Sequence, residues 1–104
     1  MTGRQVNEAA EMLGVLANAM RIRMVHIMLE GELQVGDLAN RVSLSSSATS
    51  QHLRRFKMAG LLVQRKDEQS RYCTIAPDKV DILQRMISIA EAHQVNQPGN
   101  IPRP

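Results

Sequence analysis

The chain has 104 residues, of which 43% are hydrophobic and only 2% aromatic, so it can form one compact domain with an aliphatic, methionine-rich core. Its single cysteine excludes an intrachain disulfide and a cysteine-rich zinc site, and the lack of a long apolar run or an apolar signal core predicts a soluble cytoplasmic protein without a membrane partner. The formal net charge is only +3, from 13 Lys and Arg against 10 Asp and Glu.

The first half of the chain is predicted to be helical, because apolar side chains recur there at steps of three and four residues. The expected helices cover residues 5–18, 19–29, 35–41 and 46–58. Gly31 stops the second helix. Ser45 is the expected N-cap of the fourth, since its hydroxyl can accept a hydrogen bond from a free backbone N–H, and Gly60 ends that helix.

A β-hairpin and a last helix are predicted next. Two short strands, Leu61–Lys66 and Arg71–Ile75, flank the polar turn Asp67–Ser70. Pro77 and Asp78 open a helix that runs to about His93.

These elements predict one domain over residues 1–93, mainly α with a small β-hairpin. Helices three and four together with the hairpin form a winged helix-turn-helix. Residues 94–104 hold three of the four prolines and are expected to form a disordered tail.

The fourth predicted helix has two different faces. At about 100° per residue, Thr49, Leu53 and Phe56 share an inward arc, and the opposite arc is polar and basic. Short polar side chains in the first turn of such a helix can bond base edges in the major groove, and cations further along contact phosphates. The predicted DNA-binding residues here are Ser45, Ser46, Ser47, Ser50, Gln51, Arg54, Arg55 and Lys57. Ser45 alone can equally act only as a cap.

Positive charge is concentrated in the same region. Residues 45–71 hold six basic and two acidic residues, a balance of +4, which leaves −1 for the rest of the chain. A surface that binds a polyanion has this distribution, although a solvated face can have it too. The hairpin can reach the flanking backbone or the minor groove, and its candidate contacts are Arg65, Lys66, Gln69 and Arg71.

The first and last predicted helices carry apolar residues over more than the ~100° that one core needs. At about 25 cal/mol per Å2, burying this surface against a second copy would be favourable. We therefore expect a homodimer whose two recognition helices address the halves of an imperfect palindrome. The predicted interface residues are Val6, Ala9, Leu13, Leu83, Met86, Ile87 and Ala90.

Four segments together resemble the ArsR/SmtB family of bacterial repressors, and the likeness covers about residues 9–93. They are Leu16–Arg23, Glu32–Ala39, Ser45–Leu53 and Ala59–Val63. The resemblance implies a dimeric winged-helix repressor that is often released by an effector, which the sequence does not identify. It also implies that bases are read by Ser46, Ser47, Ser50 and Gln51, with the wing at Arg65–Arg71.

The resemblance also implies which ligands a metal sensor of this family would need. Gln34 and Gly36 stand where such sensors have a cysteine pair. The last helix offers Asp78, Asp81, Glu91 and His93, but not at the spacing of the second known metal site. The chain therefore resembles the metal-independent members, and we expect no metal and no cofactor.

Three alternatives to a DNA-binding repressor can be stated from the sequence. Cys73 shares a strand face with Ile75 and is expected to be a buried small hydrophobe, but it could instead be the redox or sulfur sensor of a responsive repressor. The winged fold could also bind a partner protein. An enzyme is not expected, because the sequence has no nucleophile–base pair, phosphate loop or metal cluster.

Overall fold

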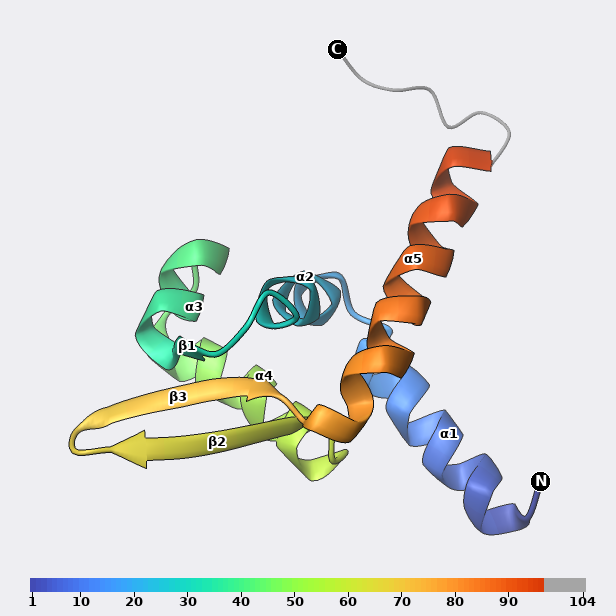
Figure 1. The fold of residues 1–104 in the computed structure, drawn as a ribbon, viewed down its shortest axis with the longest axis horizontal. Coiled ribbons are helices and arrows are strands. Elements are labelled where there is room, and N and C mark those ends of the chain that lie inside the picture. Colours follow the sequence, from blue (N-terminus) through green and yellow to red (C-terminus); the bar gives the residue numbers. More distant parts are fainter. Residues whose placement is uncertain (97–104) are drawn as a thin grey trace.

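The computed structural model describes residues 1–96, which form a mainly helical fold with a small antiparallel sheet (Figure 1). The helices are α1 (Gly3–Leu16), α2 (Ala19–Met28), α3 (Val35–Val42), α4 (Ser46–Met58) and α5 (Val80–Asn96), preceded by the 3-10 turn η1 (Pro77–Lys79). The strands are β1 (Leu33–Gln34), β2 (Leu62–Asp67) and β3 (Ser70–Ile75). None of the described helices combines the length and the hydropathy that a membrane span requires.

Side-chain caps set the start of the first two helices. Thr2 and Gln5 form a capping box, in which each side chain accepts a hydrogen bond from the other's backbone N–H, at 3.2 and 2.8 Å. This box starts α1 at Gly3, two residues earlier than predicted. The Asn18 side chain accepts a hydrogen bond from the Arg21 N–H at 3.0 Å and so separates α2 from α1.

The sheet has one strand more than the predicted hairpin. Its order is β1-β3-β2, and β1 pairs with β3 through Leu33 with Cys73 and Gln34 with Tyr72. A two-residue strand has no room for the alternation that marks strands in a sequence, which is why the prediction missed it.

The predicted boundary between domain and tail is also corrected. Residues 94–96 belong to α5, because neither glycine nor proline follows His93 until Pro98, and proline disfavours helix at the residue before it. The remainder of the predicted disordered tail, residues 97–104, lies outside the described residues.

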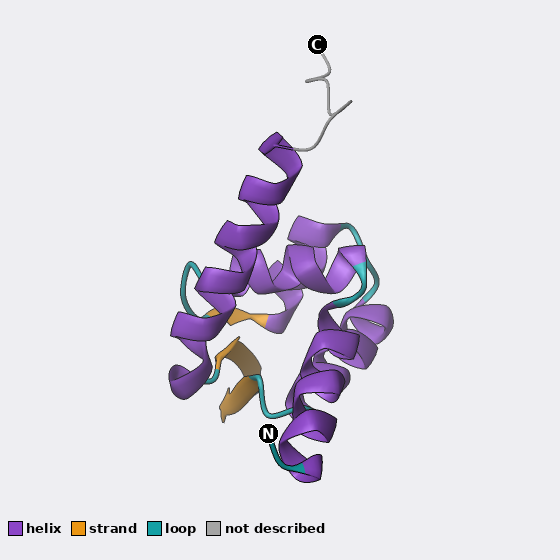
Figure 2. Ribbon diagram, turned by 90° about the vertical axis from the view of Figure 1, so that its right-hand side faces the viewer, coloured by secondary structure: helices purple, strands orange, loops and turns teal. Residues whose placement is uncertain are grey.

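A single core lies between α2, α3, α4 and the sheet. Phe56 is its largest fully buried side chain, and Met24, Met28, Leu38 and Leu53 are enclosed with it. This core fixes the rotation of α4 about its axis, and hence which residues of α4 point outward. Figures 1 and 2 show α5 extending beyond the packed helices, and Figure 1 shows the β2–β3 hairpin reaching out on the side opposite to α1 and α5.

Helices α1 and α5 bury little of their apolar surface. Leu13 on α1 and Ile89 on α5 are 53% and 69% exposed, and Val6 is also exposed. Leu83 is only 1% exposed within the single chain, so little of its side chain is left for the dimer interface in which it is predicted. It faces α2, where it lines an apolar groove with Val25.

Candidate nucleic-acid interface

The recognition helix α4 is held at both ends as the sequence predicted. Ser45 is its N-cap, and the Ser45 Oγ accepts a hydrogen bond from the Ala48 N–H at 3.0 Å. At the other end the Leu61 N–H donates to the Phe56 carbonyl at 3.0 Å, while Gly60 adopts a φ of +73°. Glycine takes this left-handed conformation without strain, which lets the chain leave α4 and enter β2.

The two faces of α4 are those expected from its periodicity. Thr49, Leu53 and Phe56 are buried in the core. The predicted DNA-binding residues of the helix all lie on the outward side, Ser50 half-buried and Ser46, Ser47, Gln51, Arg54, Arg55 and Lys57 exposed. The small polar residues therefore occupy the first turns of α4 and the cations its last turns.

The strand register divides the wing residues between two faces of the sheet. Lys66 lies directly opposite Arg71 across β2 and β3, and Arg65 lies opposite Tyr72. Because side chains alternate along a strand, Lys66 and Arg71 share one face, while Arg65 is on the other. Gln69 is exposed at the hairpin tip.

Helix α4 and the wing enclose an open hollow of about 410 Å3. Its lining contains two arginines and one lysine but no carboxylate: Ser50, Arg54, Lys57, Met58, Gln64 and Arg71. The face of the sheet that carries Arg71 is thus the face turned toward α4. This hollow joins the polar side of the recognition helix to the basic side of the wing.

Ion pairing leaves this surface with free positive charge. Among the described residues the ion pairs are Arg4–Glu8, Arg41–Glu30, Arg65–Glu32, Lys79–Asp78 and Arg85–Asp81. None of them involves Arg54, Arg55, Lys57, Lys66 or Arg71. Cations without a protein carboxylate beside them are available to a polyanion.

Arg65 differs from the other wing candidates because it already has a partner. Its guanidinium donates to the Glu32 carboxylate, with a closest N–O distance of 2.7 Å, and lies over the Tyr72 ring. The hydrogen bond from Arg65 holds the pKa of Glu32 below its ordinary value. Glu32 lies 33 residues from Arg65 along the chain, so no local pattern in the sequence predicts this pair.

Cys73 is buried, as the strand alternation predicted. Its Sγ–H donates to the Leu33 carbonyl at 3.7 Å. Burial, with a smaller effect of the Glu32 charge, raises the pKa of the thiol to about 11. Because the thiolate is the reactive form, this environment does not favour the alternative of a redox sensor.

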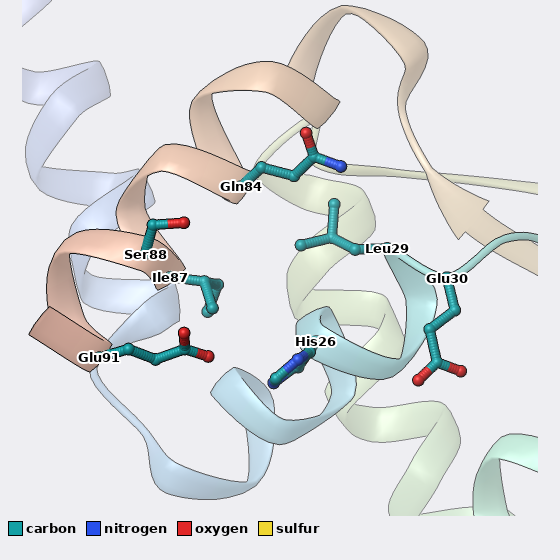
Figure 3. A pocket seen from close by; sticks show the side chains of 7 residues that line it. All are labelled: His26, Leu29, Glu30, Gln84, Ile87, Ser88 and Glu91. Carbon is teal, nitrogen blue, oxygen red and sulfur yellow. The ribbon is translucent and has the colours of Figure 1, made fainter.

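A second hollow lies between α2 and α5, apart from the α4 surface (Figure 3). Figure 3 shows Ser88 and Glu91 of α5 facing His26 of α2 and Leu29, the residue that follows α2, with the Glu30 carboxylate directed away. His26 is exposed. The described residues contain no group of three or more His, Cys, Asp and Glu side chains placed to hold a metal ion.

Comparison with known proteins gives one consistent result. Residues 18–63 match the family model described as bacterial regulatory protein, arsR family. The chain is 37% identical over 73 residues to the transcriptional activator HlyU of Vibrio cholerae, covering 70% of this chain and 68% of HlyU. It is 38% identical over 72 residues to the nodulation protein NolR of Rhizobium meliloti, covering 69% of this chain and 59% of NolR.

Solved structures agree with this result. The structure of HlyU from Vibrio cholerae has a TM-score of 0.74 at 32% identity, covering 91% of this chain and 98% of that chain. A homodimeric winged helix-turn-helix DNA-binding domain, Mb0332 from Mycobacterium bovis, has a TM-score of 0.82 over 94% of both chains. At 20% identity this second likeness concerns the fold alone.

Proposed function

This chain belongs to the arsR family of bacterial regulatory proteins, and we propose that it binds double-stranded DNA as a homodimer and represses transcription at an imperfect palindrome. The observation that carries the proposal is the hollow between α4 and the wing. It is lined by Arg54, Lys57 and Arg71, has no carboxylate in its lining, and adjoins the small polar residues at the start of α4.

In the proposed complex, the first turns of α4 enter the major groove. Ser46, Ser47 and Ser50 are short enough to let the backbone approach the bases, and Gln51 can pair with an adenine edge. The cations at the end of α4 contact phosphates, which positions the helix but reads no sequence. Affinity and sequence preference therefore depend on different parts of one helix.

The wing adds a second set of phosphate contacts. Lys66 and Arg71 face each other directly across the strands. Like charges in this arrangement destabilise a hairpin, by roughly 0.2–1 kcal/mol. A phosphate that binds both side chains would remove that repulsion, which supports a role for this pair at the DNA backbone.

The exposed apolar sides of α1 and α5 support a second copy of this chain as the dimer partner. Val6, Leu13, Ile82 and Ile89 are exposed there, and Ala90 lies beside them. On the same two helices Ala9, Met86 and Ile87 are half-buried. Two-fold symmetry would present two α4 helices to successive turns of one duplex.

The test of DNA binding is a salt titration on a duplex selected from a random pool. Lys57→Ala should weaken binding to all duplexes. It should also make the negative slope of log K against log salt less steep by about 0.9, the value for one lost phosphate contact. Gln51→Ala should reduce discrimination between duplexes and leave the slope unchanged. Arg4→Ala, which removes a cation of α1 paired with Glu8, is the matched control. DNA affinity that does not change with salt would contradict the proposal. Salt-insensitive complexes that contain no DNA would favour a protein partner.

The dimer is tested separately. Leu13→Asp should shift the protein from dimer to monomer in sedimentation equilibrium, because it places a charge on the exposed apolar side of α1. Val63→Asp makes the same change at an exposed position of the wing and should leave the dimer intact. A wild-type monomer at micromolar concentration would refute the predicted assembly.

A further inference from the structure

An ion pair crosses the sheet on the face turned away from α4. Arg65 stands on β2 at one edge, directly opposite Tyr72 on the central strand β3. Its guanidinium lies 4.2 Å from the centre of the Tyr72 ring. Beyond the ring it reaches Glu32, the residue before β1, with N–O distances of 2.7, 2.9 and 3.0 Å. One side chain thus joins the two edges of the sheet.

Further contacts of the same region tie the hairpin to the segment that follows α2. The Gln34 side chain donates to the Tyr72 hydroxyl at 3.4 Å, and β1 pairs with β3. By contrast, β2 is exposed from Val63 to Asp67. The base of the hairpin is the Leu62–Ile75 pair, and the three-stranded part of the sheet lies beyond it, at Cys73 and Tyr72. The hairpin is therefore held beyond its base, where Glu32 and Arg65 lie.

We propose that the Glu32–Arg65 pair is a positioning device for DNA binding, which holds the hairpin so that Lys66 and Arg71 face the same duplex as α4. The inference rests on the DNA binding proposed above. In this role Arg65 does not contact phosphate, because its fork is occupied by the Glu32 carboxylate and it lies on the opposite face from Arg71.

The direction in which one substitution changes DNA affinity distinguishes a positioning role from a simple effect of charge. Removing the Glu32 charge from a protein that binds a polyanion should strengthen binding if charge alone matters. If the pair positions the wing, the same substitution weakens binding, because Lys66 and Arg71 are no longer held toward the duplex.

Arg65→Lys separates positioning from direct phosphate contact. Lysine keeps the positive charge and can still bind a phosphate as a point charge. It cannot form the two-pronged contact with a carboxylate or stack over Tyr72 as a planar group. A phosphate ligand would therefore tolerate this change, whereas the positioning pair would be lost.

The experiment compares Glu32→Gln, Arg65→Lys and the double variant on the selected duplex. Each single variant should lose affinity by about two- to fivefold, the range that exposed ion pairs support. The double variant should lose no more DNA affinity than the single variant that binds less tightly, since both substitutions act through one pair. Glu68→Gln, which removes a carboxylate from the wing tip where no ion pair holds it among the described residues, is the matched control and should bind as tightly as wild type or more tightly.

Tyr72 gives a readout that needs no DNA. It is the single tyrosine of a chain without tryptophan, so intrinsic fluorescence reports on the ring under Arg65. Both single variants should change this emission, and the Glu68→Gln control should not. Tighter binding by Glu32→Gln, wild-type binding by Arg65→Lys, or unchanged emission in both would overturn the positioning role. Failure of the wild-type protein to bind any duplex would instead overturn the proposed function on which it rests.

Discussion

Ser45 can be tested for two roles, the helix cap that the structure shows and the proposed approach to DNA. Its hydroxyl accepts a hydrogen bond from the Ala48 N–H at 3.0 Å and so caps α4. It also lies beside Ser46 and Ser47, at the end of α4 proposed to enter the major groove. Substitution by alanine, asparagine and aspartate separates the cap from the approach to DNA, because asparagine and aspartate keep a capping oxygen and alanine does not.

The expected changes in stability follow from the cap. Ser45→Ala should lower the free energy of unfolding by about 1 kcal/mol, the usual cost of losing an N-cap. For a domain of this size such a loss lowers Tm by roughly 4–8 °C. Ser45→Asn should remain close to wild type. Ser45→Asp should be as stable or slightly more stable, because a negative charge at a helix N-terminus contributes about 0.3–1 kcal/mol.

DNA affinity should follow a different order. Ser45→Asp places a carboxylate where the duplex is proposed to lie, and we expect a loss of roughly tenfold or more from like-charge repulsion. Ser45→Asn should bind as wild type if the residue acts only as a cap. Thermal unfolding by circular dichroism and anisotropy of a labelled duplex measure the two quantities. Undiminished DNA binding by Ser45→Asp would refute the placement of this helix end in the groove, and undiminished stability of Ser45→Ala would refute the cap.

Three further predictions concern the interior of the domain. The Thr49 hydroxyl is buried and has no hydrogen-bond partner among the described residues. Thr49→Val should therefore raise the free energy of unfolding, measured by denaturant titration, by about 1 kcal/mol. A decrease would show that the hydroxyl is bonded. Burial, aided by the charges of Arg21 and Arg55, lowers the pKa of His52 below its ordinary value of 6.5. The unfolded state therefore binds the proton more readily than the folded state does. The free energy of unfolding should consequently fall as the pH drops below 6.5. His52→Gln should flatten this dependence in thermal unfolding, and parallel curves would contradict it. Because Cys73 is buried, mild peroxide should leave DNA affinity unchanged; a loss in wild type that Cys73→Ala prevents would restore the redox alternative.

The recognition helix could be predicted from the sequence because its signal is local. The spacing of Thr49, Leu53 and Phe56 fixes which side of α4 enters the core, and the cap and Gly60 fix its ends. The same reasoning placed Leu83 on an apolar stripe of the last helix, but periodicity alone cannot say whether such a residue faces its own chain or a partner.

The sequence predicts that the wing is a hairpin, but it does not predict which side chains of the hairpin lie on the face toward α4. Whether Arg65 or Lys66 points toward α4 depends on strand register, and a shift of one residue exchanges the two faces. The Arg65–Glu32 contact joins residues that are distant along the chain, and the strand β1 beside it is only two residues long. None of these features leaves a periodic pattern in the sequence.

The distribution of ion pairs explains how a chain of small net charge can present one strongly basic surface. Glu8, Glu30, Glu32, Asp78 and Asp81 each pair with a cation outside the hollow between α4 and the wing. At physiological salt, exposed charges further apart than about 8 Å are largely screened from each other. A duplex that approaches α4 meets the cations that line this hollow and no carboxylate in its lining. The orientation in which DNA approaches therefore depends on where the carboxylates are paired. A substitution that introduces a carboxylate into this hollow should reduce DNA affinity more than one that removes a cation from α1.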